Sequence, residues 1–290
     1  MTDGVVMSVD VRLPHDLRVI TSDATAGKHL LPVSQVRWVP TEVGQPLCFY
    51  SVSADGRVSE WGVLSTSLYH TDILDFHYRP YRTKHSTTSL HGTATCIAFN
   101  PQDKSVMVVG VDTGSVLQVN TASTVHALTH YHAHTGPVRA VAWNTYHHKV
   151  FATCSLDWSL KVWLQYHTSP LVSLDLGAPV AGLAWSYFSS SVIVGVTDEG
   201  RVYVYDLFVR KCRPLCVQNI LQRRRSALSC VAFSPFYPVI LVGGERGYLL
   251  TLKLSPNLRR NHKTRDELSP REAEVCKMER IIATTRSTLK

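Results

Sequence analysis

The sequence of 290 residues predicts an all-β fold built from repeated blades, and a recurring nine-residue pattern is the main reason. The pattern places a turn residue at its fourth position and then alternates side chains up to an apolar or aromatic ending. This is typical of a tight turn that leads into a half-buried strand. The six copies span residues 1–9, 53–61, 111–119, 155–163, 197–205 and 244–252, and their turn residues are Gly4, Gly56, Gly114, Trp158, Gly200 and Gly247.

A second short strand precedes five of the six copies and ends 14 to 18 positions before the turn residue. An outer strand is expected after each unit, for example at 72–78 after the second copy. A repeat of about 42 to 58 residues that consists of short strands predicts the blades of a β-propeller. The preceding strands are 34–38, 95–99, 139–143, 181–185 and 229–233.

Two repeats carry four polar residues at matched spacing. A His lies before the first strand, a Ser lies two residues before a turn Asp, and a Trp follows that Asp by six positions. An imidazole, a hydroxyl, a carboxylate and an indole N–H can satisfy one another where water is excluded. The pattern resembles the WD40 repeat and predicts two structural tetrads, His29, Ser53, Asp55 and Trp61, and His134, Ser155, Asp157 and Trp163.

The repeats divide the chain into three parts. Residues 1–10 are predicted to be the end of an incomplete blade, 11–254 to form five full WD40 blades, and 255–290 to be a basic tail. Because propellers of this type usually close with seven blades, the sequence is interpreted as truncated at its start. No apolar run of about 18 residues predicts a membrane span, and seven Cys without a CxxC pair favour a reducing compartment.

The tail is expected to contain a short helix at about 270–284. Ser269, Pro270 and Glu272 have the form of an N-cap, a first-turn proline and a capping-box Glu. An apolar stripe follows at three- and four-residue spacing. This helix either docks a partner or packs on its own propeller, and its stripe consists of Val275, Met278 and Ile282.

Four longer segments resemble the dynein intermediate chains, most closely the axonemal outer-arm members. They are residues 27–38, 149–163, 192–207 and 238–260. The resemblance implies a seven-bladed, non-catalytic scaffold without a cofactor. It also implies binding to the tail of a dynein heavy chain, beside a second intermediate chain, to support arm assembly and ciliary beating. Light chains would bind a region before the propeller that is absent here. The alternative is a WD40 interaction platform of another intracellular complex.

Partner-binding residues are predicted from exposure and charge. Trp158 is a large aromatic residue at a turn position that the other copies give to Gly, which makes it a candidate anchor or a blade-packing residue. The net charge is +8, and the basic run Arg223, Arg224 and Arg225 is either a solvated loop or a contact with an acidic surface of a heavy chain or tubulin. No aromatic residues are interleaved with it, which disfavours nucleic acid.

No catalytic or metal site is predicted. The sequence has no phosphate-binding loop, nucleophile elbow or HExxH motif. The histidines at 126, 130, 132 and 134 cluster, but no neighbouring carboxylate or thiol completes a ligand set.

Overall fold

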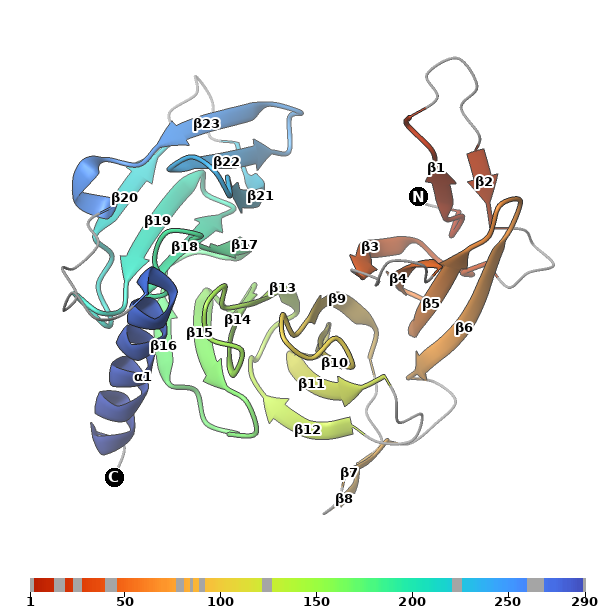
Figure 1. The fold of residues 1–290 in the computed structure, drawn as a ribbon, viewed down its shortest axis with the longest axis horizontal. Coiled ribbons are helices and arrows are strands. Elements are labelled where there is room, and N and C mark those ends of the chain that lie inside the picture. Colours follow the sequence, from red (N-terminus) through yellow and green to blue (C-terminus); the bar gives the residue numbers. More distant parts are fainter. Residues whose placement is uncertain are drawn as a thin grey trace.

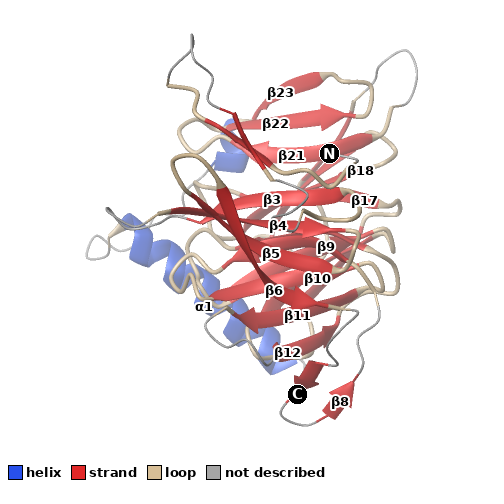
Figure 2. Cartoon of the chain, turned by 90° about the vertical axis from the view of Figure 1, so that its right-hand side faces the viewer, coloured by secondary structure: helices blue, strands red, loops and turns tan. Residues whose placement is uncertain are grey.

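The fold is an arc of antiparallel sheets whose faces stack on one another (Figure 1). Figure 2, a view turned by 90°, shows the long C-terminal helix beside the sheets rather than among them. The computed structural model describes residues 3–12, 19–22, 28–39, 46–76, 81–83, 86–88, 92–121, 127–220, 226–259 and 269–288.

Four of the sheets contain four strands each, arranged in chain order from the inside of the arc outward. The first is β3 (Val33–Val39), β4 (Leu47–Ser53), β5 (Arg57–Val63) and β6 (Leu68–Asp75). The second is β9 (Ala94–Phe99), β10 (Val106–Val111), β11 (Ser115–Asn120) and β12 (Ala127–His132). The third is β13 (Val138–Trp143), β14 (Val150–Ser155), β15 (Ser159–Leu164) and β16 (Val172–Asp175). The fourth is β17 (Val180–Trp185), β18 (Val192–Thr197), β19 (Arg201–Asp206) and β20 (Cys216–Asn219).

Smaller elements complete the chain. A three-stranded sheet contains β21 (Leu228–Phe233), β22 (Val239–Gly244) and β23 (Leu249–Lys253), and a two-stranded sheet pairs β1 (Met7–Val9) with β2 (Val19–Thr21). A hairpin of β7 (Tyr81–Thr83) and β8 (Ser86–Thr88) lies outside the blades. A 3-10 turn, Pro256–Arg259, precedes the helix α1, Pro270–Thr288.

The predicted WD40-type blades are therefore present, with three differences from the sequence analysis. The last blade has three strands among the described residues, not four. The incomplete first blade extends beyond residue 10, because β2 pairs with β1. The outer strand expected at 72–78 begins earlier, at Leu68, and ends at Asp75.

The apolar core is divided into layers between neighbouring blades. One layer joins the β3–β6 and β9–β12 sheets, the next joins β9–β12 and β13–β16, and further layers follow along the arc. The second strands of the three central blades, β10, β14 and β18, are therefore buried on both faces. The sequences of these strands are mostly apolar without alternation for that reason.

All six turn residues of the nine-residue pattern adopt the left-handed backbone conformation. Their φ angles are 73° at Gly4, 77° at Gly56, 88° at Gly114, 72° at Trp158, 81° at Gly200 and 75° at Gly247. Glycine adopts this conformation without the steric penalty that a Cβ imposes. The glycine of the pattern is thus explained by turn geometry, and Trp158 is the exception.

The helix α1 begins with the predicted capping box. The Ser269 N–H donates to Glu272 Oε2 at 3.0 Å, and the Glu272 N–H donates to Ser269 Oγ at 3.3 Å. The helix ends at Thr288 rather than near residue 284. No helix in the described part of the chain is both long and apolar enough to cross a membrane.

Candidate interaction surfaces and the buried tetrads

The antiparallel blades present two opposite faces. The turn face carries the turn residues Gly56, Gly114, Trp158, Gly200 and Gly247, together with the segments that lead into the inner strands. The loop face carries the loops at the other ends of the strands, among them 144–149, 165–171 and 186–191. A partner that binds the propeller meets one of these faces or its rim, because the strands are paired with one another.

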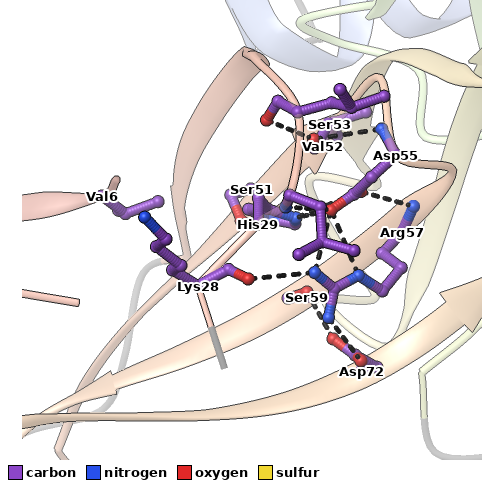
Figure 3. Close-up of polar contacts among 12 residues, drawn as sticks. Val6, Lys28, His29, Ser51, Val52, Ser53, Asp55, Arg57, Ser59 and Asp72 are labelled. Atoms are coloured by element: carbon purple, nitrogen blue, oxygen red, sulfur yellow. Dashed lines mark hydrogen bonds and ion pairs between the residues drawn. The ribbon is translucent and has the colours of Figure 1, made fainter. Parts of the chain in front are cut away.

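The first tetrad lies at the turn face between β4 and β5 (Figure 3). His29 Nδ1 lies 3.1 Å from Asp55 Oδ2, and His29 Nε2 lies 2.6 Å from Ser51 Oγ. The Trp61 Nε1–H donates to the same Ser51 hydroxyl at 2.7 Å. Ser51 therefore joins the two rings.

The sequence analysis assigned this position to Ser53, and that assignment is wrong. The Ser53 hydroxyl donates to Leu31 O at 2.9 Å and accepts the Asp55 N–H at 3.2 Å, which fastens the turn. Strand register explains the difference. Trp61 pairs with Phe49, so Ser53 lies four residues away along β4, about 13 Å at the usual rise, whereas Ser51 lies at half that distance.

The second tetrad repeats this arrangement between β14 and β15. His134 Nδ1 lies 3.0 Å from Asp157 Oδ2, His134 Nε2 lies 2.7 Å from Thr153 Oγ1, and Trp163 Nε1–H donates to Thr153 Oγ1 at 2.9 Å. Thr153 thus takes the position that the sequence analysis gave to Ser155. The Ser155 hydroxyl donates to Gly136 O at 2.9 Å and accepts the Asp157 N–H at 3.1 Å.

Burial and hydrogen bonding together set the protonation of these groups. It lowers the pKa of His134 to about 4, against the opposing charge of Asp157, so the imidazole is neutral at pH 7. Burial would raise the pKa of Asp157, but hydrogen bonds from Ser159 and the proximity of His134 outweigh it and lower that pKa. Burial also lowers the pKa of His29. Burial would raise the pKa of Asp55, but hydrogen bonds from the Leu30 N–H and the Arg57 side chain outweigh it and lower that pKa. A neutral His that donates from Nδ1 to an ionised carboxylate accepts at Nε2, so the Thr153 hydroxyl donates to it.

A hydroxyl, an imidazole and a carboxylate in line also occur in nucleophilic enzymes. Here the hydroxyls of Ser51 and Thr153 are fully buried, and each also accepts an indole N–H. A nucleophile needs an open side from which a substrate can approach. The geometry supports a structural tetrad and provides no access for a substrate.

The first tetrad has an additional ion pair. Arg57 Nη2 lies 2.9 Å from Asp55 Oδ2 and donates to Lys28 O at 3.0 Å, and Arg57 Nη1 lies 3.4 Å from Asp72 Oδ2 (Figure 3). These bonds tie the turn to the outer strand β6 and to the segment before β3. In the second tetrad the equivalent position is Ser159, whose hydroxyl donates to Asp157 Oδ1 at 2.7 Å.

Trp158 lies at the turn face with 52% of its surface exposed. Its carbonyl oxygen accepts the Leu176 N–H at 3.0 Å, which joins the turn to the segment after β16. The other predicted partner-binding residues, Arg223, Arg224 and Arg225, lie outside the described residues.

The helix α1 packs on the loop face of its own propeller. Met278 and Ile281 are buried in the core layer between the third and fourth four-stranded sheets, and Ile282 packs against it. Val275, expected in the same stripe, is half-buried. Of the two interpretations of this helix, packing on the propeller is the one observed, since its apolar side is already covered.

A buried polar network fastens the same helix. Lys277 Nζ donates to Ser189 Oγ at 2.6 Å and lies 3.4 Å from Glu274 Oε2. Glu274 Oε2 accepts the Ser190 N–H at 2.6 Å. The sequence analysis missed these residues, because a charged pair three residues apart on a helix is ordinarily solvated.

The histidine cluster gathers no ligand set in the described part of the chain. The rings of His130 and His132 lie 4.2 Å apart between centroids, and His134 belongs to the tetrad. Burial lowers the pKa of His130.

Comparisons with known proteins agree with this geometry. The family model described as "WD domain, G-beta repeat" matches residues 126–163, which include the second tetrad. The fold and the buried tetrads define a WD-repeat protein of the β-propeller class. Within that class, the chain is a relative of the axonemal dynein intermediate chains and matches their C-terminal part.

Three relatives illustrate the similarity. The chain is 37% identical to "Dynein intermediate chain 2, ciliary" of Heliocidaris crassispina, over 98% of this chain and 42% of that protein. It is 34% identical to "Dynein axonemal intermediate chain 1" of Bos taurus, over 98% and 41% of the two lengths. It is 29% identical to "Dynein, 78 kDa intermediate chain, flagellar outer arm" of Chlamydomonas reinhardtii, over 99% and 43%. The chain spans about two fifths of the length of these relatives.

Proposed function

We propose that the chain is the propeller part of an axonemal outer-arm dynein intermediate chain. In this role it is a non-catalytic scaffold of the cytoskeleton that binds the tail of a dynein heavy chain and supports arm assembly and ciliary or flagellar beating. The observation that carries the proposal is the similarity over 98% of the chain to proteins named as ciliary and axonemal dynein intermediate chains. ATP hydrolysis then belongs to the heavy chain.

The architecture supports a scaffold role. The polar side chains with the geometry of a catalytic set are buried in the tetrads, and the helix α1 is packed on the loop face. The turn face and the outer rim remain available for large partners. A second intermediate chain is the natural neighbour in the same arm, and light chains and tubulin are further candidate contacts.

The test is incorporation into arms. A tagged chain is expressed in ciliated cells, axonemes are isolated, and their salt extract is separated on a sucrose gradient. We expect the tag to sediment with dynein heavy chains and to form chemical cross-links with a heavy-chain tail. A chain that sediments apart from the heavy chains, in a complex of other composition, would support a WD40 platform of another complex instead.

A further inference from the structure

The backbone of Trp158 performs the task that glycine performs in the other turns. Its carbonyl oxygen accepts the Leu176 N–H at 3.0 Å. The corresponding distances are 3.0 Å for Gly56 O and Phe76 N, 2.9 Å for Gly114 O and His134 N, and 2.9 Å for Gly200 O and Ile220 N. The turn therefore needs the backbone conformation of residue 158 and not its side chain.

That conformation is unfavourable for tryptophan. Its φ of 72° lies in the left-handed region, where the Cβ of a bulky residue crowds the following carbonyl. Strain of this kind persists where the surrounding structure enforces it, and it concentrates at functional sites. Glycine would remove the strain and keep the turn.

The indole takes no part in the polar and aromatic contacts of the fold that surround the other tryptophans. Within the described residues it makes no hydrogen bond or ring contact, and it belongs to none of the core layers. Each of the other five tryptophans has a partner: Trp61 bonds Ser51, Trp163 bonds Thr153, Trp143 bonds Ala98 O, Trp185 bonds Ala142 O, and Trp38 packs edge-on against Phe49.

The neighbourhood of Trp158 is suited to a cation. Asp175 is exposed and lies opposite Ser159 in the β15–β16 register, one residue from Trp158. Its Oδ1 accepts the Gly177 N–H at 2.9 Å, and its Oδ2 has no donor among the described residues. The Cβ side of Gly177 is open, because a Cβ built there would meet no atom within 4 Å. A partner side chain can therefore approach the backbone two residues beyond Asp175.

We infer that Trp158 and Asp175 form a docking point for an arginine of another subunit in the dynein arm. A guanidinium can stack on the indole face while it pairs with the free carboxylate oxygen. Tryptophan and arginine are also the residues that most often dominate binding energy at protein interfaces. The inference rests on the proposed function, because it places the partner within a dynein arm.

The test exploits the opposite effects of one substitution on stability and on binding. We expect Trp158→Gly to raise the midpoint of thermal unfolding by about 2 °C or more. In cells that also express the wild-type chain, we expect the same variant to enter arms roughly tenfold less well. Asp175→Asn should show the loss of incorporation without the gain in stability.

Tyr166 provides a matched control. It is the other non-glycine residue with a positive φ, 64°, in the described chain, it is 58% exposed, and it lies at the opposite end of β15. Tyr166→Gly should also raise the unfolding midpoint, but it should enter arms as wild type does. The contrast separates relief of backbone strain from loss of a docking residue.

A photo-crosslinking amino acid in place of Trp158 identifies the partner chemistry. We expect cross-links to a peptide of another arm subunit that contains arginine. Cross-links only within the chain, or to peptides without arginine, would overturn the inference, as would normal incorporation or reduced stability of Trp158→Gly. If the wild-type chain itself sediments apart from heavy chains, the proposed function fails; if it joins arms and Trp158→Gly joins equally well, only the docking inference fails.

Discussion

Removal of the Thr153 hydroxyl tests the tetrad of the β13–β16 blade most directly. Thr153→Val keeps the shape of the side chain and leaves two buried groups without partners, His134 Nε2 at 2.7 Å and the Trp163 N–H at 2.9 Å. Each buried polar group that loses its partner costs about 1 to 3 kcal/mol. We therefore expect the free energy of unfolding to fall by about 2 to 5 kcal/mol, and the midpoint by about 4 to 10 °C for a chain of this size.

A double-mutant cycle measures the predicted coupling. Trp163→Phe removes the indole N–H, so its effect overlaps with that of Thr153→Val, and we expect a coupling energy of about 1 kcal/mol from urea unfolding. Ser155→Ala should show no such coupling, because the Ser155 hydroxyl bonds Gly136 O and the Asp157 N–H instead. The reasoning is refuted if Ser155 couples to Trp163 and Thr153 does not.

A conservative control checks that threonine replacement alone is not responsible. Thr121 Oγ1 donates to Ser105 O at 3.2 Å at a half-buried position. Thr121→Val should cost less than about 1 kcal/mol, since water replaces the lost bond. Equal losses from the two valine variants would contradict the buried network.

Three further predictions concern pH, the helix and the blade faces. The pKa of His134 is lowered from 6.5 to about 4, so below pH 6.5 the unfolded chain takes up a proton that the folded chain does not. The free energy of unfolding, measured with urea, should therefore be highest above pH 6.5 and fall by up to about 3 kcal/mol as the pH drops to 4. A free energy of unfolding that does not change over this range would contradict a buried neutral His134. Met278→Ala should lower the free energy of unfolding by about 2 to 5 kcal/mol and make α1 susceptible to proteolysis. Ala283 is exposed, so Ala283→Ser should change neither property. A Met278→Ala variant with unchanged stability and protease resistance would mean that the helix is not packed on the propeller. Residues 1–290 alone should self-associate through the apolar faces at the two ends of the arc, where Trp38 is 55% and Leu249 is 67% exposed. Trp38→Lys and Leu249→Lys should therefore shift the molecular mass measured by light scattering toward that of the monomer. An unchanged mass distribution would exclude these faces as the site of association.

The repeat pattern could be predicted from the sequence because local physics determines it. A turn residue with positive φ favours Gly, and the half-buried strand after it favours alternating apolar and polar side chains, so both signals recur with each blade. All six predicted turn residues have a positive φ. The inner strands follow for the same reason. The capping box of α1 is equally local, since it joins Ser269 and Glu272 within one turn.

The partners of the tetrads required the tertiary structure. Spacing alone identified His134, Asp157 and Trp163 as one set, but two hydroxyls lie on the same face of β14, Thr153 and Ser155. Only the register of β14 with β15 decides which of them reaches the indole. The spacing of two residues in the sequence shows whether they lie opposite each other on neighbouring strands only when the register of those strands is known.

By itself, then, the sequence determined the class of fold, the positions of the turns and the start of the helix, because each depends on residues close together in the chain. The tertiary structure decided where α1 packs, which charged residues it buries, and that the Trp158 side chain faces solvent. These depend on surfaces from blades far apart in sequence. An apolar stripe or an aromatic turn residue has the same pattern whether its partner is the same chain or another protein, and only the packed blades distinguish the two.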